Sequence, residues 1–400
     1  MNADDTAVRG FLPPLRVGLS GTAEGGYPVH IGRGLLDRLG ELVARAAPAD
    51  RYVVIADAEV GALYGVRATA SLTAAGLRSV TLTFPAGERS KSRATWAELT
   101  DRMLSAGVGR DGAIVALGGG VTGDLAGFTA STYMRGLPFV VVPTSLLAML
   151  DSAIGGKTGL DTPAGKNTVG AFHHPCLVVV DPDLLGTLPS AQRRAGLAEA
   201  VKSAAIADEA LFGWIEERAA SLREGDIAAL EYLVTSCLRI KAEVVAADPE
   251  EAGRRQVLNF GHTAGHALEA LAELRLPHGE AVAAGMRLEA RLGEGAGVTQ
   301  PGTAGRLAAA LDSCGLPDAI AAAGASERFG GPVTAERLLD AAAADKKARR
   351  GAVRWVLLRR IGEVARAADG GWAHALPDEG LSTRLSAALR AAADVRDSAS

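Results

Sequence analysis

Residues 113–128 read AIVALGGGVTGDLAGF, and this stretch decides the fold class. The first five residues form an apolar run of the kind buried in parallel sheets, and the residues after the glycines follow a helical pattern. A G-x-G-x-x-G turn between a strand and a helix lets backbone N–H groups approach a diphosphate at the helix N-terminus. The stretch therefore predicts a βα unit that binds a dinucleotide, although a tight, close-packed turn has the same pattern.

The neighbouring sequence extends this unit into a domain. Short apolar or alternating runs at 51–57, 79–84, 139–143 and 177–181 predict further strands, and helical patterns separate them. We therefore expect residues 1–185 to form a Rossmann-like α/β domain that includes the dinucleotide turn. Beyond this point long Ala-, Leu- and Glu-rich helical patterns dominate, so residues 186–400 are expected to form a mainly α-helical domain.

Composition excludes several classes of protein. The chain has 400 residues, is 48% hydrophobic, carries a net charge of −4 and contains three scattered cysteines. Because no basic run or long apolar segment occurs, we expect neither a nucleic-acid partner nor a membrane partner. The sparse cysteines indicate buried thiols, and the polar N-terminal stretch does not resemble a signal peptide, so the protein is expected to be cytoplasmic.

The acidic residue that would bind the dinucleotide's ribose stands in an unusual place. The strand after the glycine turn closes with Pro143, Thr144 and Ser145 and offers no acid, whereas Asp57 ends an earlier predicted strand. Asp57 is therefore the expected ribose ligand. The polar turn at 87–91 follows another strand and could face the same cofactor, although such a turn is more often a solvated loop.

Three histidines within seventeen residues indicate a metal site. LNFGHTAGH carries His262 and His266, and LPHGEAV carries His278. On a helix, Asn259, His262, His266 and Glu269 would share one face. A catalytic metal usually has three protein ligands and one open position, and a carboxylate is the expected third ligand here. Glu199 in GLAEAVK is one candidate, but spacing alone does not choose among the carboxylates.

Several lysine and arginine residues occupy positions where an ordinary solvent-exposed charge would be unexpected. Lys157 and the pair Lys166-Asn167 stand in glycine-rich segments that we expect to be loops, and Lys241 interrupts the apolar stripe of a predicted helix. Arg255 falls one turn before Asn259. Together with Lys346 these residues suggest a substrate with more than one anionic group, since Arg suits carboxylates and Lys suits phosphate.

These segments together resemble the 3-dehydroquinate synthase family of sugar-phosphate cyclases. The motifs GGGVTGDLAGF, YMRG, VPTSLLAMLDSAIGGKTGLDTPAGKNTVGAF, GLAEAVK, IKAEVVAAD, LNFGHTAGHALE, HGEAVAAGM and DKK occur in the family's order and spacing. The resemblance covers about residues 30–365. It implies an N-terminal NAD-binding domain, a helical C-terminal domain that holds Zn²⁺ or Co²⁺, and a homodimer.

The resemblance also implies roles for individual residues. It makes Glu199, His262 and His278 the metal ligands and His266 the acid/base residue. It implies a phosphate site of Lys157, Asn167, Lys346 and Arg135, with Arg135 supplied by the neighbouring subunit, and carboxylate binders Arg255 and Lys241. Contacts to substrate hydroxyls and ketone are implied for Asp151, Lys202 and Asn259, so the catalytic set is His266, Lys202, Asn259, Asp151, Lys157, Lys241 and Arg255. The implied NAD-binding residues are Asp57, Glu88, Lys91, Gly119, Gly120, Val121, Thr122, Gly123, Asp124, Thr144, Ser145, Lys157 and Lys166.

The implied activity is that of a carbon–oxygen lyase in the shikimate pathway. Its substrate would be 3-deoxy-D-arabino-heptulosonate 7-phosphate, its products 3-dehydroquinate and phosphate, and NAD⁺ would be recycled. Another cyclase, above all an amino-dehydroquinate synthase, is the main alternative. A glycerol-type dehydrogenase would not need six anion-binding cations, and an inactive paralogue would be expected to lack one of the site residues.

Overall fold

The computed structural model describes residues 13–19, 25–163, 165–273, 275–321, 325–344 and 353–397, which form two compact units. The first unit contains the described residues up to Pro189 and takes in Leu230–Glu250 as well. The second contains Ser190–Ala229 and the described residues from Glu251 onward. The sequence had assigned 230–250 to the helical half, because a helical pattern does not reveal which core the helix packs on.

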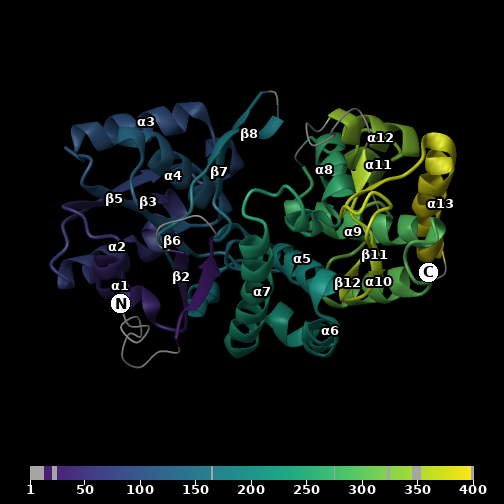
Figure 1. Ribbon diagram of the computed structural model, residues 1–400, viewed down its shortest axis with the longest axis horizontal. Helices are drawn as coiled ribbons and strands as arrows, with labels where there is room; N and C mark the ends of the chain where they lie inside the picture. The colour runs from purple at the N-terminus through teal and green to yellow at the C-terminus, as the bar shows by residue number, and fades with distance from the viewer. Residues whose placement is uncertain are drawn as a thin grey trace. The chain divides into compact units, whose positions relative to one another are not determined.

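The first unit is built on a seven-stranded sheet with the order β1-β2-β9-β6-β5-β3-β4. All neighbouring strands are parallel except β1 and β2, and these two were not predicted from the sequence. Figure 1 shows the sheet between α1 and α2 below and α3 and α4 above. The strands are β1 (Leu15–Gly18), β2 (Gly26–Ile31), β3 (Arg51–Asp57), β4 (Ser79–Phe84), β5 (Gly112–Gly118), β6 (Phe139–Pro143) and β9 (Leu177–Val180).

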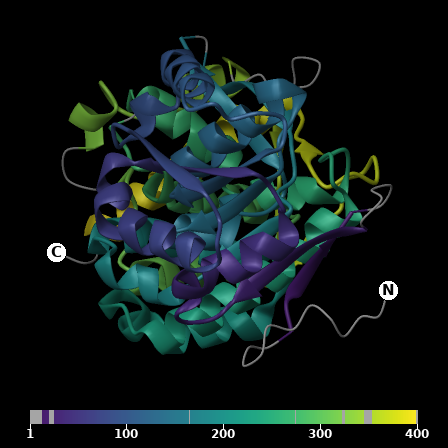
Figure 2. The same cartoon turned by 90° about the vertical axis from the view of Figure 1, so that its left-hand side faces the viewer.

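Helices connect the parallel strands in the manner of doubly wound α/β folds. They are α1 (Leu39–Ala46), α2 (Ala58–Ala74), α3 (Arg93–Ser105) and α4 (Gly120–Thr132). The central strand β5 is buried along its whole length, which agrees with its continuous apolar sequence. Figure 2 gives a second view of the purple and blue helices and strands of this unit.

Strand register brings the predicted dinucleotide motifs to one edge of the sheet. Because Ile55 pairs with Ala116 in parallel register, Asp57 at the end of β3 lies beside Gly118 at the end of β5. On the other side Gly118 pairs with Pro143, and its carbonyl accepts a 3.0 Å hydrogen bond from the Thr144 N–H. The chain leaves β3 toward β4 and leaves β5 toward β6, in opposite directions. This is a topological switch point, where α/β proteins bind ligands outside the carboxyl ends of the strands.

A separate antiparallel hairpin carries Lys157, Lys166 and Asn167. These residues lie in β7 (Lys157–Thr162) and β8 (Gly165–Phe172), so the expectation of glycine-rich loops was wrong. The glycines are needed for close strand approach: a Cβ on Gly170 would stand 2.2 Å from the Thr158 carbonyl oxygen.

The second unit is mainly helical, as predicted. Its helices are α5 (Ser190–Ala207), α6 (Glu209–Glu224), α8 (His262–Leu271), α9 (His278–Gly295), α10 (Thr303–Ser313), α11 (Ala325–Arg328), α12 (Ala335–Ala344) and α13 (Asp378–Asp397), and α7 (Ile227–Ala247) begins in it. A core around α8, α9, α12 and α13 buries Phe329 and Trp355 completely. Short pairs β10 (Arg354–Trp355) with β13 (His374–Ala375) and β11 (Leu358–Arg360) with β12 (Glu363–Val364) complete the unit.

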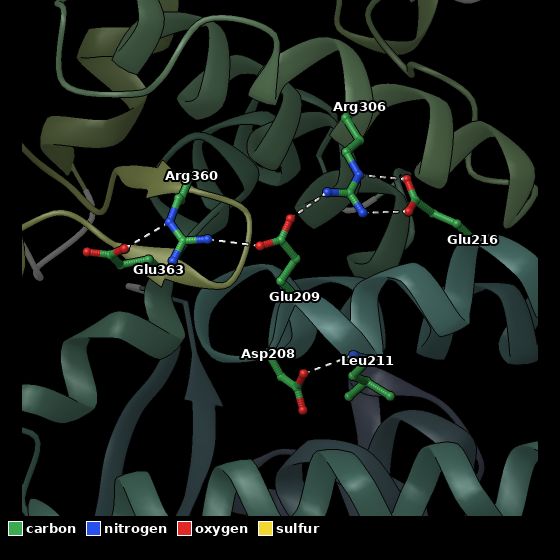
Figure 3. A network of polar contacts seen from close by, with 7 residues as sticks. All are labelled: Asp208, Glu209, Leu211, Glu216, Arg306, Arg360 and Glu363. Carbon is green, nitrogen blue, oxygen red and sulfur yellow. Dashed lines mark hydrogen bonds and ion pairs between the residues drawn. The ribbon is translucent and has the colours of Figure 1, made fainter.

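A surface ion-pair network joins three elements of this unit (Figure 3). Arg306 of α10 forms a two-pronged bond with Glu216 of α6, at 2.8 and 3.1 Å, and also reaches Glu209 at 2.9 Å. Glu209 in turn accepts from Arg360, which pairs with Glu363 across the β11–β12 turn. These partly exposed ion pairs connect α6, α10 and the β11–β12 strand pair. None of the helices within the described residues combines the length and apolar character needed to cross a membrane.

Candidate active site

Three helices of the second unit bring the expected metal ligands together. Glu199 lies in the middle of α5, His262 is the first residue of α8 and His278 is the first residue of α9. Glu199 Oε1 is 3.6 Å from His262 Nε2 and 3.5 Å from His278 Nε2. The ligands of a tetrahedral zinc site with bonds of about 2.1 Å are themselves about 3.4 Å apart. The donor types and their spacing therefore fit Zn²⁺ or a metal of similar geometry.

The ring nitrogens that face away from Glu199 have oxygen partners. His262 Nδ1 lies 3.2 Å from the Phe260 carbonyl oxygen, and His278 Nδ1 lies 3.5 Å from Glu269 Oε1. If each ring carries its hydrogen on Nδ1, that hydrogen can be donated to the nearby oxygen. The Nε2 of each ring then directs its lone pair toward Glu199. Metal-bound histidines commonly show this arrangement.

Protonation of the two histidines differs in the metal-free protein. Burial, together with the nearby Lys202 ammonium, holds the pKa of His262 well below its usual value, so this ring is neutral at neutral pH. Burial also disfavours a charge on His278, but its contacts with Glu199 and Glu269 outweigh burial and raise its pKa to about 9. A metal ion entering here must therefore displace a proton from His278.

Glu199 is shared between the histidines and a buried lysine. Its Oε2 lies 2.5 Å from Lys202 Nζ, one turn along α5, while Oε1 faces the rings. Both side chains are almost fully buried, at 1% and 2% exposure. The lysine thus orients the carboxylate and compensates its charge.

His266 completes the cluster without being one of these three ligands. Its ring centroid lies 5.4 Å from that of His262 and 6.2 Å from that of His278. It stands one turn beyond His262 on α8, as the spacing predicted. Its place beside the ligands suits a group that exchanges protons with a molecule held there.

Asn259 and Arg255 do not lie on the helix that carries the histidines, so that expectation was wrong. They lie in a 3₁₀ helix, η6 (Arg254–Asn259), and Gly261 at φ 78° breaks the chain before α8 begins. A left-handed glycine at this point starts a new helix direction, which a pattern of i, i+3 and i+4 spacings does not reveal. Asn259 Nδ2 donates to Glu251 Oε1 at 2.7 Å, and Arg255 is 2% exposed.

Sequence reasoning missed a carboxylate that holds the start of α8. Glu289 of α9 is fully buried and accepts hydrogen bonds from the backbone N–H groups of Gly261 at 2.8 Å and Ala264 at 3.1 Å. It therefore caps α8 from a neighbouring helix. Burial raises its pKa to about 8 even though these N–H groups favour the charged form. The available signal was the spacing of Glu289, three residues after Met286 and seven after Val282, which places it on the buried face of α9.

In the first unit, the carboxyl edge of the sheet carries most of the residues expected to bind NAD. Gly119 caps α4, which starts at Gly120, and the Asp57 carboxylate caps α2 by accepting from the Val60 N–H at 2.9 Å. Gly118 is needed for packing, because a Cβ there would lie 2.3 Å from Thr122 Oγ1. Among the described residues no side chain caps the N-terminus of α4, so its first backbone N–H groups are donors suited to a diphosphate.

Lys91 contacts Asp124, an expected NAD-binding residue, and Asn167, an expected phosphate-binding residue. It follows the short helix η2 (Glu88–Ser90), is 4% exposed, contacts Asp124 Oδ2 at 2.5 Å and also donates to Asn167 Oδ1. Burial disfavours its charge, but the Asp124 carboxylate outweighs burial and raises its pKa. The buried Lys91 thus ties the start of α4 to the β7–β8 hairpin.

The remaining expected residues of the first unit lie in α7, in the short helix Ala148–Ser152, at the start of β7 and in the segment after α4. Lys241 of α7 is 6% exposed and donates to Asp151, to Oδ1 at 2.5 Å and also to the backbone oxygen, as a lysine on a buried stripe requires. Lys157 is exposed at the start of β7. Arg135 is exposed and has a left-handed backbone, with φ 70°. Lys346 lies outside the described residues.

Comparison with known proteins supports the same assignment across both units. The family profile "3-dehydroquinate synthase N-terminal" matches residues 81–195, and "3-dehydroquinate synthase C-terminal" matches residues 196–348. The 3-dehydroquinate synthase of Symbiobacterium thermophilum is 47% identical over 340 residues, which cover 84% of this chain and 92% of that protein. The enzyme of Caulobacter vibrioides is 45% identical over 352 residues, covering 87% of this chain and 94% of that protein.

A solved relative shows the same architecture. The 2-epi-5-epi-valiolone synthase of Streptomyces hygroscopicus subsp. jinggangensis 5008, solved with NAD⁺ and Zn²⁺ bound, superposes with a TM-score of 0.81 at 29% identity. The match covers 94% of this chain and 99% of that protein. The fold class predicted from the sequence is thereby confirmed, and the chain belongs to the 3-dehydroquinate synthase family of enzymes.

Proposed function

We propose that this 3-dehydroquinate synthase acts on 3-deoxy-D-arabino-heptulosonate 7-phosphate and releases 3-dehydroquinate and phosphate, with one NAD⁺ and one Zn²⁺ or Co²⁺ per active site. The observation that carries the proposal is the cluster of Glu199, His262 and His278, whose donor atoms lie within 4.8 Å of one another. The structural relative with NAD⁺ and Zn²⁺ bound supports the choice of both groups.

In this proposal the second unit holds the metal and the reacting oxygens. Glu199, His262 and His278 hold the ion, and Lys202 keeps Glu199 oriented through its 2.5 Å contact. His266 exchanges the proton of the substrate hydroxyl. Arg255 binds the substrate carboxylate through its planar fork, and Asn259 contacts a substrate hydroxyl.

The first unit holds the dinucleotide and the phosphate. The turn from Gly119 to Asp124, together with Asp57, Glu88, Lys91, Thr144, Ser145 and Lys166, binds NAD⁺. The β7–β8 hairpin supplies Lys157 and Asn167 to the phosphate, and Lys346, which lies outside the described residues, is a further phosphate ligand of the proposal. Lys241 binds the substrate carboxylate, and Asp151 contacts a substrate hydroxyl. When bound, NAD⁺ supplies a reversible hydride acceptor, and the metal lowers the pKa of the hydroxyl that it polarises.

We further propose a homodimer in which Arg135 serves the neighbouring subunit's phosphate site. Met134 and Arg135 both have left-handed backbone angles, with φ of 52° and 70°, and Gly136 follows at 122°. Two consecutive non-glycine residues in this region cost about 1–2 kcal/mol each, and such strain concentrates at functional sites. Sedimentation analysis should give a dimer. In mixtures of Arg135→Ala with His266→Ala protein, subunit exchange should restore activity, because the mixed dimer holds one intact site.

Product identification tests the reaction. The enzyme is incubated with the heptulosonate phosphate, Zn²⁺ and a substoichiometric amount of NAD⁺, and phosphate release and product mass are followed. We expect many turnovers per NAD⁺, one phosphate per 3-dehydroquinate, and no lasting NADH absorbance. Stoichiometric NADH would point to a dehydrogenase instead. Preferred turnover of the amino analogue of the substrate, or of sedoheptulose 7-phosphate, would assign the chain to another cyclase.

A further inference from the structure

We infer that Glu269 is a positioning residue that keeps His278 in the tautomer needed for metal binding, an inference that rests on the proposed metal site. Glu269 lies in α8, two turns beyond His262, and is 4% exposed. Its Oε1 is 3.5 Å from His278 Nδ1, and His278 Nε2 is 3.5 Å from Glu199 Oε1. The imidazole therefore stands between two carboxylates, one on each ring nitrogen.

Glu199 and Glu269 have different roles, because they face different nitrogens of the His278 ring. Glu199 faces both His262 and His278, so its side of the ring is the metal side. Glu269 faces the far nitrogen of His278, where it can accept a hydrogen bond from Nδ1–H. That bond leaves the lone pair on Nε2 and increases its basicity. The Phe260 carbonyl serves His262 Nδ1 in the same way, at 3.2 Å. Both histidine ligands are thus oriented by an oxygen of α8 or of the turn before it.

A second metal ion is the competing explanation for Glu269. Donor atoms of His266, Glu269 and His278 also lie within 4.8 Å of one another. His278 would then have to bind one metal through each nitrogen, as a doubly deprotonated ring. A neutral imidazole carries a hydrogen on one nitrogen, and this favours one metal and one hydrogen-bonded carboxylate. The number of metal ions bound per chain separates the two explanations.

The test compares Glu269→Gln and Glu269→Ala with the natural protein. The dissociation constant for Zn²⁺ is measured by competition with a chromophoric chelator, and metal content is measured after equilibration. Loss of an outer carboxylate typically weakens metal binding about 10- to 100-fold. We expect this for Glu269→Ala, with Glu269→Gln in between because the amide oxygen can still accept from Nδ1–H. The near-isosteric Gln variant keeps the test valid if the Ala variant does not fold.

Glu294→Gln is the matched control. Glu294 lies in α9 and accepts a 2.9 Å hydrogen bond from the Ala304 N–H at the start of α10, so its loss affects packing but not the metal. We expect its Zn²⁺ dissociation constant to equal that of the natural protein. Unchanged metal affinity in both Glu269 variants, even with a lower melting temperature, would overturn the inference, as would two Zn²⁺ per chain. If the natural protein itself bound no metal, the proposed function would fail instead.

Discussion

Replacing Gly285 by Ala should separate the two helices that carry the proposed histidine ligands, His262 and His278. Gly285 lies in α9 where α8 crosses it, and a Cβ there would stand 2.0 Å from the Gly261 carbonyl oxygen and 2.7 Å from the Gly265 nitrogen. Both are backbone atoms, so no side-chain rotation relieves the clash. Normal contact requires about 3.5 Å, and the helices must therefore separate by about 1 Å or more.

The energetic consequence is the difference between two opposing effects. Overpacking of a close contact costs about 1–3 kcal/mol, and the backbone clash places this site at the upper end of that range. Alanine in a helix interior regains about 1 kcal/mol over glycine. The net destabilisation is about 2 kcal/mol, which lowers the melting temperature by about 4–8 °C for a unit of this size.

The larger consequence is at the proposed metal site. Gly261 immediately precedes His262, and metal–ligand distances tolerate only about 0.2 Å. A shift of about 1 Å in α8 should weaken Zn²⁺ binding strongly and reduce turnover about a hundred-fold. Thermal unfolding with and without excess Zn²⁺ measures the loss of stability. Chelator competition measures Zn²⁺ affinity, and phosphate release measures turnover.

Gly305→Ala is the control for the same chemical change. Gly305 lies in α10, and a Cβ there meets nothing within 4 Å. We expect this variant to gain up to about 1 kcal/mol and to bind Zn²⁺ normally. The reasoning would be refuted if Gly285→Ala were as stable as Gly305→Ala and kept the natural Zn²⁺ affinity.

Variants at three further positions test other parts of the site. Glu199→Gln should abolish tight Zn²⁺ binding. It should also destabilise the metal-free protein by about 3–5 kcal/mol, because Lys202 loses a buried charged partner. Urea unfolding without metal that matches the natural protein would contradict this. Arg255→Ala should lower kcat/KM by roughly thirty-fold to several thousand-fold, with Arg255→Lys in between and phosphate inhibition unchanged; a nearly silent Ala variant would argue against carboxylate binding. Glu289 has a folded pKa of about 8 against an ordinary value of 4.5, so stability is full below pH 4.5 and declines as pH rises to about 8. Glu289→Gln does not ionise, so its stability relative to the natural protein should improve between pH 5 and 8.5 by up to about 1.4 kcal/mol per pH unit, and parallel urea curves for the two proteins would contradict this pKa.

Local sequence patterns determined much of the architecture. The buried run before the triple glycine, the strand ending at Asp57 and the long helical patterns after residue 190 each appear in the structure at nearly the expected positions. They could be predicted because hydrophobic periodicity and glycine turns are set by neighbours a few residues apart. The spacing of His262 and His266 is of the same kind, since one helical turn places both on one face.

Tertiary structure alone decided how these pieces meet. The strand order places Asp57 beside Gly118, residues 230–250 pack in the first unit, and Glu199 lies close to His262 and His278. Each of these contacts joins residues far apart in the chain. The outer carboxylates Glu269 and Glu289 were likewise assigned only when their partners were seen. Periodicity describes which face of an element is buried, but the partner that covers this face depends on long-range packing, and no local pattern encodes that partner.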